Sequence, residues 1–277
     1  TIAGCDKSLP GMLMAAARIN RPAIFLYGGS SLPGSYKGKD ISIVDVFEGI
    51  GAMEKGLITE DELYEIECNA CPGQGSCAGM FTANTMASVG EAIGMSLPGT
   101  ASIPAEDIRL RTEAENTGRQ LNYLLKNDIK PRDIMTLNAF KNAVTTVLAL
   151  GGSTNAVLHL MAIAHEAKVD LTLNTFDQLG KTVPHIADMK PFGKYHMVDL
   201  DNIGGVPVVS KILLENNLID GNCLTVTGKT VGENLEGVEI PSNQDVVSLP
   251  NNPISKEGGI AILNGSLSPN GSVVKVA

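Results

Sequence analysis

A cysteine-rich loop is the stretch of the sequence whose residue types point most directly to chemistry. In residues 68–77, CNACPGQGSC, three cysteines are interspersed with glycine and proline. Thiolates on such a loop are soft ligands for zinc or for an iron–sulfur cluster, and glycine lets the backbone turn closely around the sulfurs. The C-x2-C-x5-C spacing has no matching second pair and no histidine nearby. Spacing alone therefore leaves zinc, a cluster, redox thiols and plain core cysteines open.

A second stretch places three reactive side chains next to one another. In GCDKSLPGM (4–12), Cys5, Asp6 and Lys7 stand just ahead of a predicted helix. A thiolate and a carboxylate at one point could serve a soft and a hard metal ion. Taken alone, however, the pattern favours an ordinary helix start with Asp6 placed for the helix dipole.

A third stretch could bind an anion. In ALGGSTNAVLHL (149–160), a glycine pair leads into Ser153, which can cap the helix that follows. The free N–H groups at a helix N-terminus form a good seat for a carboxylate or a phosphate. An ordinary cap between two antiparallel helices explains the spacing equally well.

The composition argues against several classes of function. The 277 residues, 43% of them hydrophobic, can bury the core of one large or two modest domains. A net charge of −9 argues against nucleic acid or an anionic membrane as a partner. The sequence contains no run of eighteen apolar residues, so we expect no membrane-spanning helix. Five cysteines, odd in number and clustered, indicate a reducing, cytoplasmic location rather than a disulfide framework.

The elements that would position these residues predict an α/β fold, with a mostly parallel sheet flanked by helices in three α/β/α layers. Apolar runs predict strands at 22–30 and 223–228, and a strand or turn at 196–201. Helical periodicity is found at 9–20, 42–56, 58–67, 80–95, 136–150, 153–167 and 206–219. In the third of these, Thr59 is the expected N-cap, with Glu62 three residues on.

A stretch rich in Pro, Asn and Ser at 240–258 predicts a domain boundary. We therefore expect an N-terminal domain over residues 1–245. Residues 246–277 would be a linker and the first two strands of a C-terminal, β-rich domain. The chain has no start methionine and stops at VVKVA within a predicted strand, so we expect it to be part of a longer protein.

Four long sequence motifs show a resemblance to a known family: GCDKSLPGM, ACPGQGSCAGMFTANTMA, GMSLPGTA and GGSTNAVLHL. In this order they resemble the dihydroxy-acid and 6-phosphogluconate dehydratase family, and the resemblance runs from residue 4 to the end. Two further stretches, KPFGKYHMVDLDNIGGVPVVSKILLE and GNCLTVTGKTVGENL, resemble the dihydroxy-acid dehydratase branch.

The resemblance implies a hydro-lyase that removes water from a 2,3-dihydroxy-3-methyl acid and gives a 2-keto acid, in the biosynthesis of isoleucine and valine. It implies an iron–sulfur cluster held by three cysteines, [2Fe–2S] in this branch, and a nearby Mg²⁺. Cys5 and Cys77 fill two of the cluster positions. Asp6 is expected to bind Mg²⁺. Lys7, the expected catalytic residue, would be carbamylated and would be a further Mg²⁺ ligand.

The resemblance also implies site residues outside the chain. One cluster cysteine and an acidic Mg²⁺ ligand would precede Thr1, and a glutamate ligand and a serine base would follow Ala277. The family is commonly homodimeric. Its partner would be a small dihydroxy acid, with no nucleic acid and no membrane.

Some assignments keep an alternative. Cys71 lies in the same loop and could replace Cys77 as a ligand, while Cys68 is interpreted as a bystander. Ser153, Thr154 and Asn155 are candidates for substrate contact at a helix start. Three residues are predicted to belong to the core: Cys223, His159 and His165.

Two other functions compete with this one. Within the family, the alternative is a sugar-acid dehydratase acting on 6-phosphogluconate or an aldonate. Outside it, the alternative is a non-catalytic iron–sulfur protein, in which the Asp6–Lys7 pair would have no role.

Overall fold

Helices account for most of the regular structure in residues 1–276, the part of the chain that the computed structural model describes. In chain order they are α1 (Ser8–Ile19), α2 (Ile43–Glu54), α3 (Glu60–Asn69), α4 (Thr82–Ala92), α5 (Arg109–Lys126), α6 (Pro131–Ile134), α7 (Leu137–Leu150), α8 (Asn155–Ala167), α9 (Leu173–Gly180), α10 (Met197–Asn202), α11 (Gly205–Glu215) and α12 (Val231–Asn234). The strands are β1 (Ile2–Ala3), β2 (Leu26–Tyr27), β3 (Gly34–Tyr36), β4 (Lys39–Ile41), β5 (Ile260–Gly265) and β6 (Ser268–Lys275).

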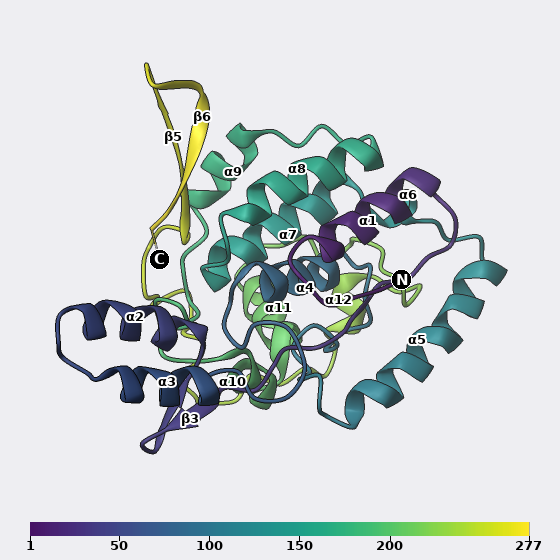
Figure 1. Cartoon of the computed structure of the whole chain (residues 1–277). Coiled ribbons are helices and arrows are strands. Elements are labelled where there is room, and N and C mark those ends of the chain that lie inside the picture. The colour runs from purple at the N-terminus through teal and green to yellow at the C-terminus, as the bar shows by residue number, and fades with distance from the viewer. Residues whose placement is uncertain (277) are drawn as a thin grey trace.

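Helices α4 and α7 form the centre of the core, with α1, α8 and α11 packed around them (Figure 1). Nearly every residue of α4 is buried, which is the pattern of a helix enclosed on all sides. Small residues let neighbouring helices approach closely: a Cβ at Gly90 would lie 3.0 Å from the ring of Phe25. The buried hydroxyl and amide groups of α4 need partners, and those partners shape the site described below.

The strands are short and form three two-stranded sheets among the described residues. Of the strand pairs within residues 1–276, only β1 and β2 are parallel, with Ile2 opposite Leu26 and Ala3 opposite Tyr27. Isolated parallel bridges join Ser30 to Ser76 and to Pro104. The predicted combination of helices with strands is confirmed, but the broad parallel sheet and the three-layer arrangement are not.

Most predicted helices are confirmed with ends shifted by a few residues, including the Thr59 cap, whose hydroxyl accepts the N–H of Glu62 at 3.2 Å. Two predictions are wrong. Residues 196–201 mostly form helix α10. Residues 223–228 form a single bridge, from Leu224 to Thr230, and a turn instead of a strand, because the Thr225 hydroxyl bonds locally to Thr227 and to the carbonyl of Lys229.

Two parts stand out from the main body. Helices α2 and α3 and the β3–β4 hairpin form an outlying unit (Figure 1) around a small apolar cluster of Ile41, Val46 and Ala70. The predicted pair of strands near the C-terminus is the antiparallel β5–β6 hairpin, which contacts α9. The domain boundary near residue 245 stays a prediction.

Gly29 follows β2, and its carbonyl accepts the N–H of Ser76 in the loop that carries Cys77. We expect Gly29→Ala to destabilise the fold strongly. Its φ is +92°, and a Cβ there would lie 2.5 Å from the Ala105 backbone. Gly38 has φ +75° with no atom within 4 Å of a Cβ. In urea unfolding, Gly38→Ala should cost about 1 kcal/mol for the left-handed backbone. Gly29→Ala should cost about 3 kcal/mol because the clash adds to it. Equal losses for the two variants would contradict this packing.

Candidate functional site

Three helix N-termini meet at the three stretches singled out in the sequence. The Cys5–Lys7 turn precedes α1, the Cys77 loop precedes α4, and the Gly151–Gly152 turn precedes α8. Helix α1 contacts both α4 and α8, and α4 contacts α8. A helix N-terminus carries a partial positive charge and free N–H groups. Three such ends at one place favour negatively charged ligands.

The turn before α1 holds its three reactive side chains together. The Ser8 hydroxyl accepts the N–H of Cys5 and donates to the carbonyl of Cys5, at 3.1 Å each. The Lys7 ammonium lies 3.0 Å from Asp6 Oδ2, and this hydrogen bond holds the pKa of Asp6 below its usual range. The Cys5 thiol donates to Asp6 Oδ1 at 3.7 Å. A thiol, a carboxylate and an amine therefore share one exposed turn.

Hydrogen bonds fasten the Cys77 loop to that turn. The Ser76 hydroxyl donates to the carbonyl of Gly4, and the Ser76 N–H donates to the carbonyl of Gly29 at 3.0 Å. The first of these bonds joins residues 72 positions apart in sequence, so that Cys77 lies beside the turn bearing Cys5.

A buried amide sets the shape of the loop after Cys77. Asn84 donates to the carbonyls of Cys77 and Gly79, both at 2.6 Å. Its own oxygen accepts the Tyr27 hydroxyl at 2.6 Å. Burial raises the pKa of Tyr27, which keeps the phenol protonated as a donor. A fully paired network of this kind is rigid and holds the Cys77 backbone in one position.

The thiols influence one another electrostatically. Partial burial raises the pKa of Cys77, and Cys5, Cys71 and Asp6 raise it further. Four groups that can become anions are thus crowded around one point, a situation that a cation relieves. Soft thiolates next to a hard carboxylate fit an iron–sulfur cluster beside Mg²⁺. The Asp6 and Lys7 side chains already reach a common point, as two ligands of one ion would.

These positions bring Cys5, Asp6, Lys7 and Cys77 together, as the sequence predicts, and they leave Cys71 close enough to compete. Within residues 1–276, no group of three or more His, Cys, Asp or Glu side chains is arranged to hold a metal ion. The roles of the four residues as ligands therefore stay predictions.

The start of α8 is tied to the start of α4. The hydroxyls of Thr82 and Ser153 lie 2.8 Å apart, and the Asn155 amide donates to Thr82 at 2.9 Å. The Ser153 N–H donates to the Thr85 hydroxyl at 3.0 Å. Ser153 accepts the N–H of Asn155 at 3.2 Å, while Thr154 occupies the N-cap position without a side-chain cap bond. The result is a cluster of hydroxyl and amide groups between two helix ends.

Sequence reasoning missed several residues of this site. Thr82 and Asn84 lie in the TANTM motif, but their spacing does not indicate that their hydrogen-bond partners lie 57 to 73 residues away in the sequence. Lys275, on β6, donates to the carbonyl of Gly151 at 2.7 Å, which brings a positive charge to the turn before α8. Burial lowers the pKa of Lys275 to about 8.

The core predictions have mixed outcomes. Cys223 and His159 are buried, as predicted. His159 lies near the Asp6–Lys7 turn: burial lowers its pKa, and the Lys7 charge lowers it further. The prediction for His165 is wrong, because this side chain is exposed. His165 follows His159 by six residues, which corresponds to a rotation of about 240° around the helix axis. The two histidines therefore face different sides of the helix.

Comparison with known proteins extends this description. Residues 1–234 match the family model "Dihydroxy-acid/6-phosphogluconate dehydratase N-terminal". A dihydroxy-acid dehydratase of Acidothermus cellulolyticus is 57% identical over 277 residues, which are 100% of this chain and 50% of that protein. Dihydroxy-acid dehydratases of Nocardioides sp. and Oceanobacillus iheyensis are 55% and 51% identical, again over 100% of this chain and 49% of each protein.

The chain thus spans about half the length of the curated relatives that it matches. No helix in the described residues combines the length and apolar character that a bilayer crossing requires. The matched residues include the Cys5–Lys7 turn, the Cys77 loop and the start of α8, so the site lies within the matched region. The chain belongs to the dihydroxy-acid/6-phosphogluconate dehydratase family and matches its N-terminal part.

Proposed function

We propose that the protein containing this chain is a dihydroxy-acid dehydratase. It removes water from 2,3-dihydroxy-3-methyl acids and gives the 2-keto acids used for isoleucine and valine. The observation that carries the proposal is the meeting of Cys5, Asp6, Lys7 and Cys77 at three helix N-termini. Identities of 51–57% along the whole chain to proteins named dihydroxy-acid dehydratase support it.

The proposed site has a soft side and a hard side. Cys5 and Cys77 would hold an iron–sulfur cluster, and Asp6 with a carbamylated Lys7 would hold Mg²⁺. When bound, these groups would supply a Lewis acid for the departing 3-hydroxyl and a cation that binds the carboxylate and 2-hydroxyl and acidifies the C2 proton. Carbamylation turns the Lys7 amine into an anionic oxygen ligand, which removes a charge that would repel the ion.

The residues of this chain would then bind and orient the substrate. The hydroxyls of Thr82 and Ser153 and the amide of Asn155 lie between the starts of α4 and α8. There they can donate to a carboxylate or a hydroxyl, and the partial positive charge of the α8 N-terminus favours a carboxylate. Lys275, beside Gly151, adds a positive charge close to these hydroxyl and amide groups. The C2 proton would pass to the serine base that the family resemblance implies in the other half of the protein.

Assembly and location are part of the proposal. We propose a homodimer in the cytoplasm, with a small-molecule substrate. Large apolar side chains on the outer faces of α2 and α3, among them Phe47 and Tyr64, are about two-thirds exposed at 65% and 66%. Such side chains are suited to contact with another protein surface.

Substrate preference tests the proposed reaction. The intact protein, purified without oxygen, should convert 2,3-dihydroxy-3-methylbutanoate to its keto acid with a kcat/KM at least about tenfold above that for 6-phosphogluconate. A pocket shaped for a branched apolar group discriminates by about that factor or more. The measurement is keto-acid formation with both substrates side by side. A preference for 6-phosphogluconate would move the protein to the sugar-acid branch of the family. Absence of turnover with either substrate, in protein carrying iron, sulfide and Mg²⁺, would contradict the enzyme assignment and favour a non-catalytic iron–sulfur protein.

A cysteine series tests the cluster ligands without reference to activity. In the intact protein, Cys5→Ser and Cys77→Ser should lower bound iron and sulfide at least about tenfold, because each removes a thiolate ligand. Cys71→Ser and Cys68→Ser remove exposed thiols at other positions of the same segment and should leave the metal content unchanged. Iron and sulfide analysis together with the visible absorption spectrum gives the readout. Loss of the cluster in Cys71→Ser, with retention in Cys77→Ser, would reverse the assignment.

A further inference from the structure

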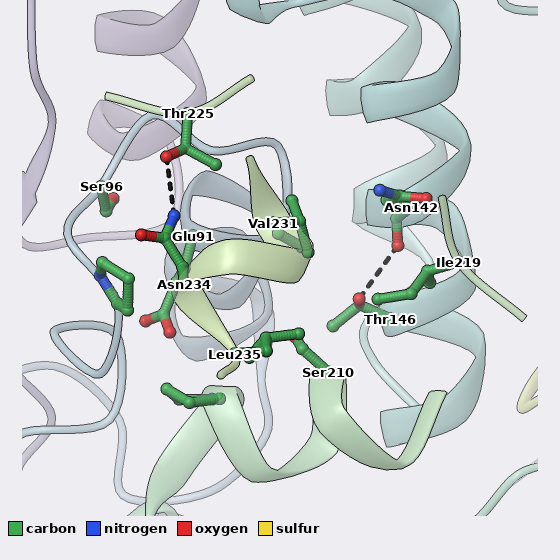
Figure 2. A pocket seen from close by; sticks show the side chains of 13 residues that line it. Glu91, Ser96, Asn142, Thr146, Ser210, Ile219, Thr225, Val231, Asn234 and Leu235 are labelled. Carbon is green, nitrogen blue, oxygen red and sulfur yellow. Dashed lines mark hydrogen bonds between the residues drawn. The ribbon is translucent and has the colours of Figure 1, made fainter. Parts of the chain in front are cut away.

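A small cavity lies at the C-terminal end of α4, whose N-terminal end faces the cysteines. Its volume is about 40 Å³, and its lining residues fall between positions 91 and 235. Figure 2 shows Glu91, Ser96 and Asn234 on one side, and Asn142 and Thr146 of α7 on the other. At about 10–15 Å³ for each water-sized particle, the cavity has room for about three.

Glu91 brings a carboxylate to this cavity without a cationic partner. Its two oxygens accept the N–H groups of Gly99 at 2.7 Å and Ala101 at 3.0 Å. A carboxylate has about four acceptor sites, so about two are left over. Among the described residues that line the cavity there is no lysine, arginine or histidine. Burial raises the pKa of Glu91 to about 7, and the charge of Asp201 acts in the same direction.

Ser96 supplies an independent sign of a missing partner. Its side chain lines the cavity and is 3% exposed, and its hydroxyl has no hydrogen-bond partner within residues 1–276. A buried hydroxyl left unpaired costs free energy, so native structures rarely leave one without a ligand or a water. The Ser210 hydroxyl also lines the cavity and adds a neutral oxygen.

We propose that this cavity binds one monovalent cation of the size of K⁺, with Glu91 as its charged ligand and the Ser96 hydroxyl as a neutral one. A single carboxylate neutralises a charge of +1, whereas a divalent ion would leave a net charge in a buried site. Mg²⁺ also demands octahedral coordination and keeps several waters, for which the space is too small. An alkylamine with more than about three heavy atoms needs more room than about three waters occupy.

The position of the cavity in the fold fits a cation. Glu91 and Ala92 are the last two residues of α4, and the C-terminal end of a helix carries a partial negative charge. The bound ion would also hold the Glu91 carboxylate in its ionised form. The bonds from Gly99 and Ala101, which fasten the 97–101 loop to α4, would then be charge-assisted. This site is separate from the proposed dehydratase site and does not depend on it.

Thermal unfolding of the intact protein at pH 8 tests the proposal. Chloride salts of K⁺, Na⁺, Li⁺ and choline would be compared at constant ionic strength. K⁺ should raise the unfolding temperature saturably, by about 5 °C at a hundred times its dissociation constant, relative to choline. Glu91→Gln, which keeps the shape and loses the charge, should abolish the K⁺-specific rise, and Ser96→Ala should shift it to higher K⁺ concentration.

A matched control and a direct probe complete the test. Glu215→Gln removes a carboxylate of α11 that pairs with Lys211 at the surface, and it should respond to K⁺ as the native chain does. Thallium NMR should detect a bound Tl⁺ signal that K⁺ displaces, in the native chain and not in Glu91→Gln. An equal response of the native chain and Glu91→Gln to K⁺, or no saturable response with no bound Tl⁺, would overturn the proposal and leave water as the occupant.

The pH dependence gives a second readout of the same site. Glu91 has a folded-state pKa of about 7, above the ordinary value of 4.5 expected in the unfolded chain. In choline buffer, ionisation of Glu91 should therefore lower stability progressively as the pH rises from about 4.5 to above 7. Asp201, whose field also reaches Glu91, is paired with Arg109 at 2.6 Å. The K⁺ effect should be larger at pH 8 than at pH 5.5, because K⁺ binds the ionised carboxylate. An effect equal at both pH values would place K⁺ elsewhere.

Discussion

The meeting of three helix N-termini is the constraint on which the rest of the site depends. Helices α1, α4 and α8 direct the partial positive charges of their N-termini toward one region, where Ser76 bonds to Gly4 and Thr82 bonds to Ser153. Such ends would repel one another if nothing negative lay between them. The residues found there are ones that can supply or bind negative charge: the thiols of Cys5 and Cys77, the carboxylate of Asp6, and hydroxyls that can receive a carboxylate. The fold thus brings groups that can carry negative charge and groups that can bind it to one place before any ligand is present.

The hydrogen bonds between the three ends keep this arrangement from spreading apart. Ser76 bonds to Gly4 between the first two ends, and Thr82 bonds to Ser153 and Asn155 between the second and third. Behind them, the Asn84 amide joins the Cys77 loop to the buried Tyr27. Each of these groups is polar and buried or partly buried, and each is paired. A fully paired polar network in a packed core holds its members more rigidly than apolar contacts do.

Much of the site could be predicted from the sequence, because its reactive residues lie in short contiguous words. Cys5, Asp6 and Lys7 are neighbours, and Ser153 follows a glycine pair in the expected place. The supporting contacts could not be predicted in this way. Tyr27 and Asn84 are 57 residues apart, and Thr82 and Ser153 are 71 apart, so their pairing is a property of helix packing. Lys275 reaches the same region from a hairpin that the sequence places in another unit.

Sequence patterns predict the helices of this fold better than its strands, for a related reason. Helices α7 and α8 reveal themselves through their own 3.6-residue periodicity. The apolar run at 22–30 predicts a long strand. Within that run only Leu26 and Tyr27 form a strand, and Ser30 meets the adjacent loops at single bridges. The sequence predicts a strand or turn where helix α10 lies, because this helix is six residues long and its start depends on the Asp199 carboxylate accepting the His196 N–H.

We propose that Cys5 and Cys77 hold one iron–sulfur cluster beside a divalent ion bound by Asp6 and Lys7. The most direct test is a crystal structure of the intact, anaerobically purified protein with anomalous diffraction at the iron edge. We expect iron peaks bonded to the sulfurs of Cys5 and Cys77, and a separate ion bonded to Asp6 and to a carbamate on Lys7. Iron bound at Cys68 or Cys71 instead, or an unmodified Lys7 still paired with Asp6 in the metal-loaded protein, would contradict it.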